Sequence, residues 1–521
     1  DNDGFNTDDF IAMLEDNSGS DMGLDDLSIA VGRIPVTSAS EAAQTVDKIY
    51  SYAADTRDGA WKNRIMMLAD DEDNGVHLEQ AEKLVKAIEA TEGQQHIIQK
   101  VYMDAYTKSG GAYPLAREEM FRYLNEGVVW WCFAGHANNH AWTHDKQLTF
   151  TDLNEMYLTR LPYIYAATCD FLRWDSNTVS GGELLFFERY GGAVGMISAT
   201  RPVYITDNGF FSEAMGRALA RRDDDGRLMA AGEIYRRAKN DIRNSRGEHR
   251  SNPNRLRYVF MGDPALRPVT PDNIVVLDSI DGKPVGTDNQ VVIAARSIVE
   301  FTGHIESPDG TKLDGFNGTV GIDIYDADRS VTSNGNGDGK AITFEVHGDK
   351  LYSGSTTVTG GEFKITVATP SEIADNFREA TLNMYATSPD ATAVGVCRDF
   401  YVYGLDEEAA DDDIAPVIDI NPPTFVSGDR VNADPMVIAR ISDNVGLNLS
   451  TAGIGHQMTI TLDGNRSYND VPYYFTPSAD GTASGEIAYP LSDLTDGPHT
   501  IMLRVWDTHT NSATKEIDFV V

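Results

Sequence analysis

The sequence lacks several features that define large functional classes. No stretch approaches the run of about 20 apolar residues that an α-helix needs to cross a bilayer. With 43 Lys and Arg residues against 80 Asp and Glu, a formal net charge of −37, the chain lacks the basic character of nucleic-acid-binding proteins, and we expect no nucleic-acid partner. The opening residues, Asp1-Asn2-Asp3-Gly4, have no signal-peptide character, which predicts a fragment or a processed form.

Cysteine is also scarce, and three residues cannot form a disulfide framework. Cys132 lies inside an apolar run and Cys397 lies in a region of strand-like pattern, so both are interpreted as small core residues. Cys169 directly follows an apolar run, where a loop begins, and is the thiol we expect to be available for chemistry. The sequence contains no GxSxG elbow, HExxH motif or phosphate-binding loop.

Two apolar runs are interpreted as neighbouring strands of a parallel sheet. Residues 128–133 and 161–168 are almost entirely apolar or strand-forming, as strands buried on both faces are. His136 follows the first run after a glycine, and Cys169 follows the second. Because the intervening length suits one strand–helix–strand crossover, we expect both side chains at one sheet edge, where open α/β sheets bind ligands. A histidine there can activate a cysteine nucleophile; the alternative is a core cysteine and an unrelated turn histidine.

The pattern of alternating strands and helices ends near residue 270. Residues 1–270 therefore predict an α/β domain with a mostly parallel sheet flanked by helices. Beyond that point the sequence has short alternating strands and Gly/Asn/Asp turns, with few helix signals. An acidic stretch at residues 407–413 resembles a linker, so we expect two all-β immunoglobulin-like sandwich domains, at residues 271–408 and 409–521.

The sequence contains weaker indications of metal binding than of a cysteine nucleophile. His136, His140 and His144 recur every four residues, which on a helix would suggest zinc, but the neighbouring Asn138-Asn139 favours a loop. Residues 334–339, with Glu345 at the twelfth position, nearly match a calcium loop, although a glycine-rich hairpin explains them better. The acidic residues 70–75 either bind calcium or form a solvated loop. We expect no required cofactor and keep structural calcium as an open alternative.

These motifs together resemble the caspase-like cysteine peptidases and, more closely, the gingipain family. The shared pattern is an apolar strand ending in Gly-His and a second one ending in Ala-x-Cys. The resemblance extends over essentially the whole chain and is strongest to the C-terminal signal peptidases (sortases) of the type IX secretion system. Supporting segments are Val31-Gly32-Arg33-Ile34-Pro35, Trp142, Leu161-Pro162, Cys169-Asp170-Phe171-Leu172, Phe260-Met261-Gly262-Asp263-Pro264-Ala265-Leu266, Asp314-Gly315-Phe316-Asn317-Gly318, Gly453-Ile454-Gly455-His456 and Trp506-Asp507.

The resemblance implies a caspase-like fold, lacking part of its beginning here, and a role for each of five residues. Cys169 would be the nucleophile and His136 the general acid/base. Asp70 or Asp71 occupies the place of the acidic residue that orients the histidine. The backbone N–H groups of Cys169 and Ala137 would bind the oxyanion, although the family usually has glycine at the second position.

The resemblance also places a substrate-pocket wall near residues 196–204, which include Met196, Arg201 and Tyr204. The loop after the histidine, residues 137–145, contains Trp142. This side chain either forms an apolar platform of a lid over the substrate or packs the loop onto the core.

The implied activity is removal of the C-terminal sorting domain of secreted cargo through a thioester, with attachment of the cargo to anionic lipopolysaccharide. The implied location is the bacterial cell surface, held there by an outer-membrane β-barrel partner. Two alternatives are a general gingipain-like secreted protease and a catalytically inactive surface scaffold.

Overall fold

The computed structural model describes residues 4–54, 57–242, 252–286, 289–336, 340–420, 426–451, 455–478, 483–492 and 494–521. The chain divides into two compact units. The first comprises Asp1–Asp272 together with Ser330–Val346, and the second comprises Asn273–Arg329 together with His347–Val521. The first unit therefore contains a short segment from the β-rich half of the sequence, which the expected division into consecutive domains did not include.

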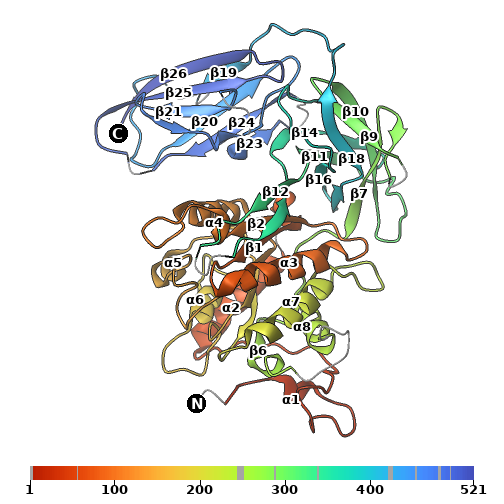
Figure 1. Cartoon of the computed structure of the whole chain (residues 1–521), viewed down its shortest axis with the longest axis vertical. Helices are drawn as coiled ribbons and strands as arrows, with labels where there is room; N and C mark the ends of the chain where they lie inside the picture. The colour runs from red at the N-terminus through yellow and green to blue at the C-terminus, as the bar shows by residue number, and fades with distance from the viewer. Residues whose placement is uncertain are drawn as a thin grey trace. The chain divides into compact units, whose positions relative to one another are not determined.

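A six-stranded sheet forms the centre of the first unit (Figure 1). Its first five strands in spatial order are parallel, and the last is antiparallel to its neighbour. The predicted helix-flanked, mostly parallel sheet is thus confirmed. The strands, in spatial order, are β2 (Ile97–Tyr102), β1 (Arg64–Ala69), β3 (Trp130–Ala134), β4 (Tyr163–Ala167), β5 (Gly195–Ala199) and β6 (Tyr258–Met261).

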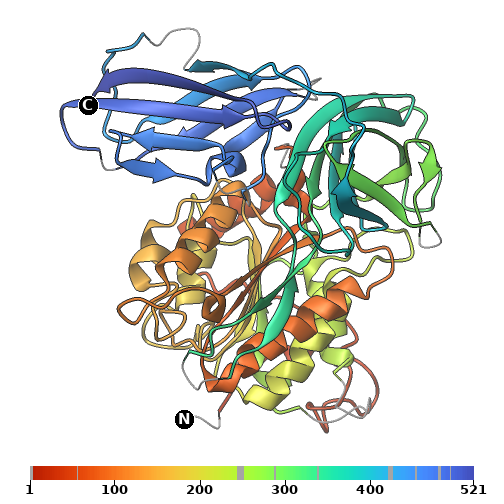
Figure 2. The same ribbon diagram turned by 45° about the horizontal axis from the view of Figure 1, so that its top comes forward.

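Each strand contributes alternate side chains to two hydrophobic cores, one on each face of the sheet. In β3, Trp130 and Cys132 enter one core, and Trp131 and Phe133 enter the other. This double burial explains the unbroken apolar runs in the sequence. Helices cover both faces (Figure 2): α3 (Val76–Glu89), α7 (Ile205–Leu219) and α8 (Ala231–Asn240) on the first, and α4 (Pro114–Glu126), α5 (Phe150–Glu155) and α6 (Gly181–Phe187) on the second.

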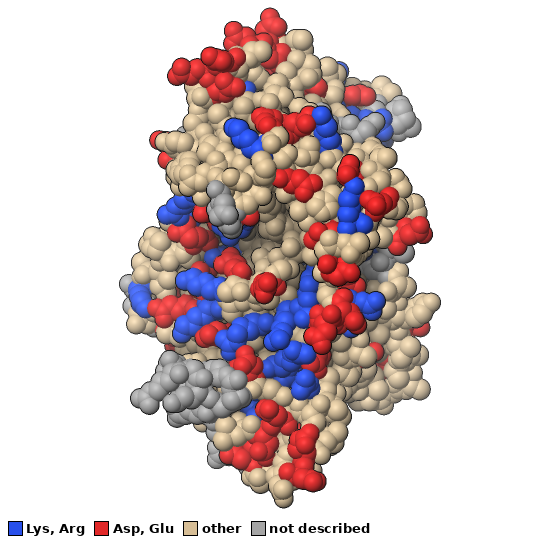
Figure 3. Space-filling model, turned by 90° about the vertical axis from the view of Figure 1, so that its right-hand side faces the viewer, with Lys and Arg blue, Asp and Glu red and all other residues tan. Residues whose placement is uncertain are grey.

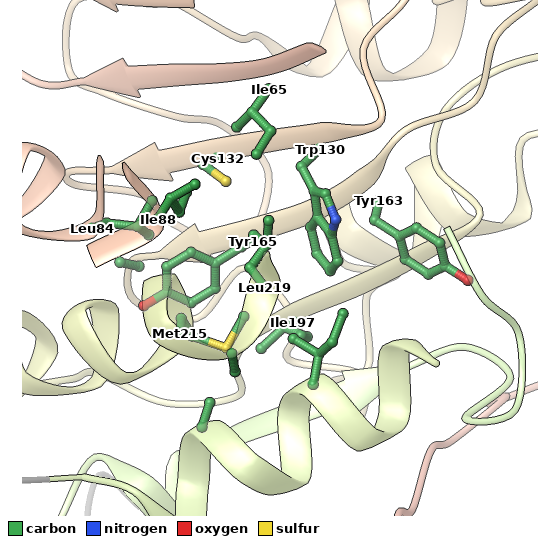
Figure 4. Packing of buried hydrophobic residues seen from close by; sticks show 14 of the residues in the cluster. Ile65, Leu84, Ile88, Trp130, Cys132, Tyr163, Tyr165, Ile197, Met215 and Leu219 are labelled. Carbon is green, nitrogen blue, oxygen red and sulfur yellow. The ribbon is translucent and has the colours of Figure 1, made fainter. Parts of the chain in front are cut away.

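Cys132 lies deep in the first of these cores, as expected of a structural cysteine. Figure 4 shows its thiol among apolar side chains from neighbouring strands and from α3. Burial raises the pKa of the Cys132 thiol far above its ordinary value. A thiol in such surroundings is inert as a nucleophile.

The first part of the second unit is a closed barrel, so the sandwich expected at residues 271–408 is wrong. Seven strands form a ring, because β7 pairs with both β17 and β10. At Gly303 a register shift bends β10, and an added Cβ there would lie 2.3 Å from the Val276 carbonyl oxygen. The strands around the ring are β10 (Ile298–Glu306), β15 (Glu362–Ala368), β14 (Lys350–Thr359), β11 (Gly318–Tyr325), β16 (Thr381–Thr387), β17 (Thr392–Cys397) and β7 (Asn273–Ile280).

A two-stranded parallel sheet of β9 (Val291–Ala295) and β18 (Phe400–Leu405) packs against the core of this ring. The C-terminal part of the second unit consists, within the described residues, of two four-stranded antiparallel sheets that share one hydrophobic core. Its immunoglobulin-like character stays a prediction. One sheet contains β19 (Val417–Ile420), β20 (Met436–Ser442), β24 (Ser484–Pro490) and β23 (Phe475–Pro477). The other contains β22 (Arg466–Tyr468), β21 (Thr459–Leu462), β25 (Pro498–Trp506) and β26 (Ser512–Val520).

The segment Ser330–Val346 contains all but the first residue of the hairpin of β12 (Arg329–Thr332) and β13 (Thr343–Val346), and it packs on the rest of the first unit. The Phe344 ring contacts Tyr102 of the edge strand β2, with ring centroids 4.7 Å apart. The Asp104 carboxylate accepts hydrogen bonds from the backbone of Gly335 (2.9 Å) and Asn336 (2.8 Å). These contacts hold the described part of the expected calcium loop by protein groups; residues 337–339 lie outside the described residues.

Basic side chains line a groove at the ends of two helices. The groove has a volume of about 870 Å³, and its charged residues are Lys83, Lys86, Glu92, Glu213, Arg217, Arg221 and Arg222. Figure 3 shows a face on which Lys and Arg side chains gather.

Among the described residues, no helix is both long and apolar enough to span a membrane.

The first unit should lose stability at mildly acidic pH because of buried His96. Burial, with a smaller contribution from the charge of Arg222, lowers the pKa of His96 to about 3. The unfolded chain binds this proton near pH 6.5, so stability is complete above that pH and decreases below it, by about 2 kcal/mol at pH 5. Urea unfolding followed by tryptophan fluorescence at pH 8 and pH 5 measures the loss. His96→Phe should reduce it; the same loss in both proteins would contradict this assignment.

Candidate active site

Strand register brings the predicted histidine and cysteine to one edge of the sheet. β3 and β4 pair in parallel, with Ala134 opposite Ala167. His136 and Cys169 each stand two residues beyond this last pair, at the carboxyl ends of adjacent strands. The structure thus gives them the placement that the apolar runs predicted, and this edge is where parallel sheets bind ligands.

Gly135 and Asp70 fix the backbone of the histidine loop. An added Cβ at Gly135 would lie 2.6 Å from Asp70 Cβ and from the Phe133 ring, so the close approach requires glycine. The Asp70 carboxylate accepts hydrogen bonds from the backbone N–H of His136 and of Asp71, both at 3.0 Å. Burial, and then the nearby carboxylates, raise the pKa of Asp70. Asp70 therefore positions the His136 main chain, whereas the sequence analysis expected it at the ring.

The ring of His136 is instead held by Asp73. His136 Nε2 lies 2.9 Å from Asp73 Oδ2 and 3.7 Å from Glu72 Oε2. The acid at the imidazole thus lies in the predicted loop, but at Asp73 and not at Asp70 or Asp71. Asp73 and Asn74 both adopt left-handed backbone, with φ of 55° and 56°, which turns the Asp73 carboxylate back toward the histidine. The spacing of residues in the sequence does not predict such a turn.

Asp71 belongs to a separate buried network. Its carboxylate accepts hydrogen bonds from the Tyr113 hydroxyl (2.6 Å) and from Lys108 Nζ (3.0 Å), and Lys108 also contacts Asp145. Burial opposes ionisation of Asp71, but the bonds from Tyr113 and Lys108 outweigh it and lower its pKa. Asp71 stabilises the loop and does not contact the His136 ring.

Cys169 is half-buried beside Val203, a neighbour that the sequence analysis did not single out. The backbone N–H of Val203 lies 3.3 Å from Cys169 Sγ. Burial raises the pKa of the Cys169 thiol, and the Val203 hydrogen bond opposes the shift only in part. A thiol in this state is protonated at neutral pH, so its reactivity depends on a base such as His136.

Two backbone donors adjoin the pair. Within the described residues, the N–H groups of Ala137 and Cys169 make no hydrogen bond to the chain. Ala137 faces Trp142 in a short bridge that leaves its N–H unused. Both groups thus remain available to a substrate oxygen, and their role in binding the oxyanion stays a prediction.

The structure corrects part of the expected substrate pocket. Trp142 is fully buried and stacks on Phe133 with ring centroids 4.3 Å apart, so it packs the loop onto the core and cannot form a platform. Met196 is fully buried inside β5 and cannot contact a substrate. Arg201 is also buried and pairs with Asp175. Tyr204 alone of the four is exposed, next to Val203 at the cysteine.

A cysteine and a histidine at the carboxyl ends of adjacent parallel strands, with an acid at the imidazole, are the groups that nucleophilic catalysis by a cysteine peptidase requires. The model of peptidase family C25 matches residues 2–269, about half of the chain, and the chain belongs to this family of gingipain-like cysteine peptidases. This finding confirms the resemblance seen in the sequence.

Solved structures of the same kind are similar to the chain. Dimeric latent PorU from Porphyromonas gingivalis is 23% identical, over 99% of this chain and 44% of that one, with a TM-score of 0.34. The chain thus spans less than half the length of PorU. The Arg-specific proteinase gingipain R (RgpB), from the same organism, is 14% identical over 77% of this chain and 79% of that one, with a TM-score of 0.41. No curated protein sequence matches the chain significantly.

Asp73 should be the residue that positions the His136 ring. Asp73→Asn replaces an acceptor at Nε2 by a group that can also donate, which favours the wrong tautomer, so we expect kcat/KM to fall about 10- to 100-fold and the pH profile to shift. Asp70→Asn is the matched control, because its amide oxygen can still accept the His136 N–H. Peptide cleavage measured against pH compares them; a shifted profile only in the Asp70 variant would contradict this role for Asp73.

Proposed function

We propose that this protein is a peptidase and transpeptidase that removes the C-terminal sorting domain of proteins secreted by a type IX system. The observation that carries the peptidase part is the placement of Cys169 and His136 at the carboxyl ends of two paired strands, with Asp73 at the imidazole. The sorting part is supported by the motifs that resemble sortases of that system, such as Cys169-Asp170-Phe171-Leu172.

The residues suggest the order of events. The Asp73 carboxylate accepts a hydrogen bond from the Nε2–H of His136, which leaves the Nδ1 lone pair to take the proton from Cys169. The thiolate adds to the scissile carbonyl, and the N–H groups of Ala137 and Cys169 stabilise the oxyanion. Collapse breaks the C–N bond, His136 returns the proton to the leaving amine, and the cargo remains as a thioester on Cys169. Attack by water regenerates the thiol and a carboxylate, and attack by an amine gives an amide.

We propose that the amine acceptor belongs to an anionic lipopolysaccharide, and that the protein lies at the bacterial cell surface with an outer-membrane β-barrel partner. The groove of Lys83, Lys86, Arg217, Arg221 and Arg222 supports an anionic ligand. The chain as a whole carries a net charge of −37, so a cluster of five basic residues differs from the rest of the protein. Among the described residues, Lys83, Lys86 and Arg221 form no ion pair within the chain.

The groove lies away from the catalytic edge. α3 starts after the carboxyl end of β1, next to the histidine loop, and its last turns, which line the groove, reach the opposite edge of the sheet. α7 follows the same course from the end of β5. An anion bound there would hold the protein on a lipopolysaccharide surface and would not itself present the amine to Cys169.

Cys169 should be required for cleavage and Cys132 should not. Cys169→Ala should abolish processing of a cargo that carries its sorting domain, while Cys132→Ala retains activity and loses about 1–2 kcal/mol of stability through a small cavity. Mass spectrometry of the products, with a small amine added, separates hydrolysis from transfer. Amine adducts support the transpeptidase; water-only products with general substrates indicate an ordinary protease, and full activity of Cys169→Ala would end the mechanism.

The groove should bind anionic glycolipid. The combined charge reversal Lys83→Glu, Lys86→Glu and Arg221→Glu should weaken binding to vesicles that contain lipopolysaccharide by roughly 100-fold at low salt, since each basic residue near such a surface contributes about 1 kcal/mol. The matched control, Lys364→Glu, Arg466→Glu and Lys515→Glu, makes the same change in net charge on the second unit. Equal binding by both variants would exclude the groove.

A further inference from the structure

The ring that the mechanism uses as its base also belongs to a cluster of metal-type ligand atoms. Oxygen or nitrogen atoms of Asp73, His77 and His136 all lie within 4.8 Å of one another. Asp73 Oδ2 is 2.9 Å from His136 Nε2 and 3.3 Å from His77 Nε2. Four ligands at about 2.0–2.1 Å from a tetrahedral Zn²⁺ lie roughly 3.3–3.4 Å from one another. The two distances from Asp73 are therefore close to the spacing that zinc requires, and the ligand atoms of the two histidines lie within 4.8 Å of each other.

His77 is the residue that has no other evident role. It lies in the first turn of α3, and only 5% of its side chain is exposed. Its Nδ1 has no hydrogen-bond partner among the described residues, and its Nε2 faces Asp73. The ring packs edge-on against His136, with centroids 4.8 Å apart. A buried imidazole fixed by a helix at this position supplies a rigid ligand.

The surroundings provide access and a fourth ligand. The side chains of Asp73 and His136 are 45% and 36% exposed, so an ion can enter from solvent. Glu72 Oε2 lies 3.7 Å from His136 Nε2 and, with water, is available to complete the shell. Two imidazoles with carboxylates are a donor set that suits Zn²⁺ and poorly suits Ca²⁺ or Mg²⁺, which favour oxygen ligands.

We propose that Asp73, His77 and His136 bind Zn²⁺ and that the bound ion holds the peptidase in a reversible inactive state. The ion takes the lone pair of His136 Nε2, so the proton of the neutral ring resides on Nδ1. The ring then has no lone pair for the proton of Cys169, and Asp73 no longer orients it. Binding concerns the chain alone, whereas inhibition rests on the proposed function.

Zinc binding is tested without activity in Cys169→Ala, which removes the thiol as a ligand. Competition with a chromophoric chelator should show one Zn²⁺ per chain in this variant. Adding His77→Gln to the Cys169→Ala protein should weaken zinc binding at least 100-fold. Adding Asp73→Ala instead should also weaken zinc binding, and because Asp73 is exposed this substitution should not alter the core. His140→Gln, in the same loop outside the cluster, is the control. Undiminished affinity in the His77 and Asp73 variants, or loss of zinc in Cys169→Ala alone, would overturn the site.

Inhibition is tested in the protein with its cysteine intact. Zinc should inhibit peptide cleavage, a chelator should restore it, and His77→Gln should raise the inhibitory concentration at least 100-fold. Binding by Cys169→Ala without inhibition of the intact protein would refute the inactive state. A chain that binds zinc through these residues but never cleaves peptide would contradict the proposed function and leave the metal site standing.

Discussion

The parallel pairing of β3 with β4 is the constraint on which the site depends. Because Ala134 stands opposite Ala167, the next residues of both strands leave the sheet together, and His136 and Cys169 reach the same edge. A shift of this register by one residue would turn the side chains of one strand to the opposite face. Trp131 and Phe133 on one face, and Trp130 and Cys132 on the other, oppose such a shift because both faces are packed.

The sequence predicted those parts of the site that depend on strand patterning. His136 and Cys169 each follow a strand that is buried on both faces, and such a strand is recognisable in the sequence as an unbroken apolar run. Their common position at the carboxyl ends of the strands follows from the parallel pairing that these runs predict. Asp73 was missed because its approach to the imidazole results from two left-handed residues in an irregular loop. Met196 was assigned to the pocket by position in the family pattern, but a residue inside a strand with both faces covered is necessarily buried.

The β-rich half shows a different limit. Strands with one buried face alternate in the same way in a sandwich and in a barrel, so the period of the sequence cannot distinguish them. The ring at residues 273–397 closes through β7, which pairs with β10 nearby in sequence and with β17 about a hundred residues later. The ring also contains the register shift at Gly303. From the sequence alone, a glycine at this position predicts only a less stable place in a strand, and not the bend.

The segment Ser330–Val346 has a consequence for how the protein is made. A ribosome completes the six-stranded sheet long before it synthesises Phe344 and the turn that surrounds Asp104. Until then Tyr102, on the edge strand β2, lacks its partner, and the nascent peptidase remains unfinished while the first barrel strands emerge. The first unit is thus completed by a segment that lies between strands of the barrel in the sequence. A protein truncated at the apparent domain boundary near residue 272 would lack this segment and would leave the edge strand β2 uncovered.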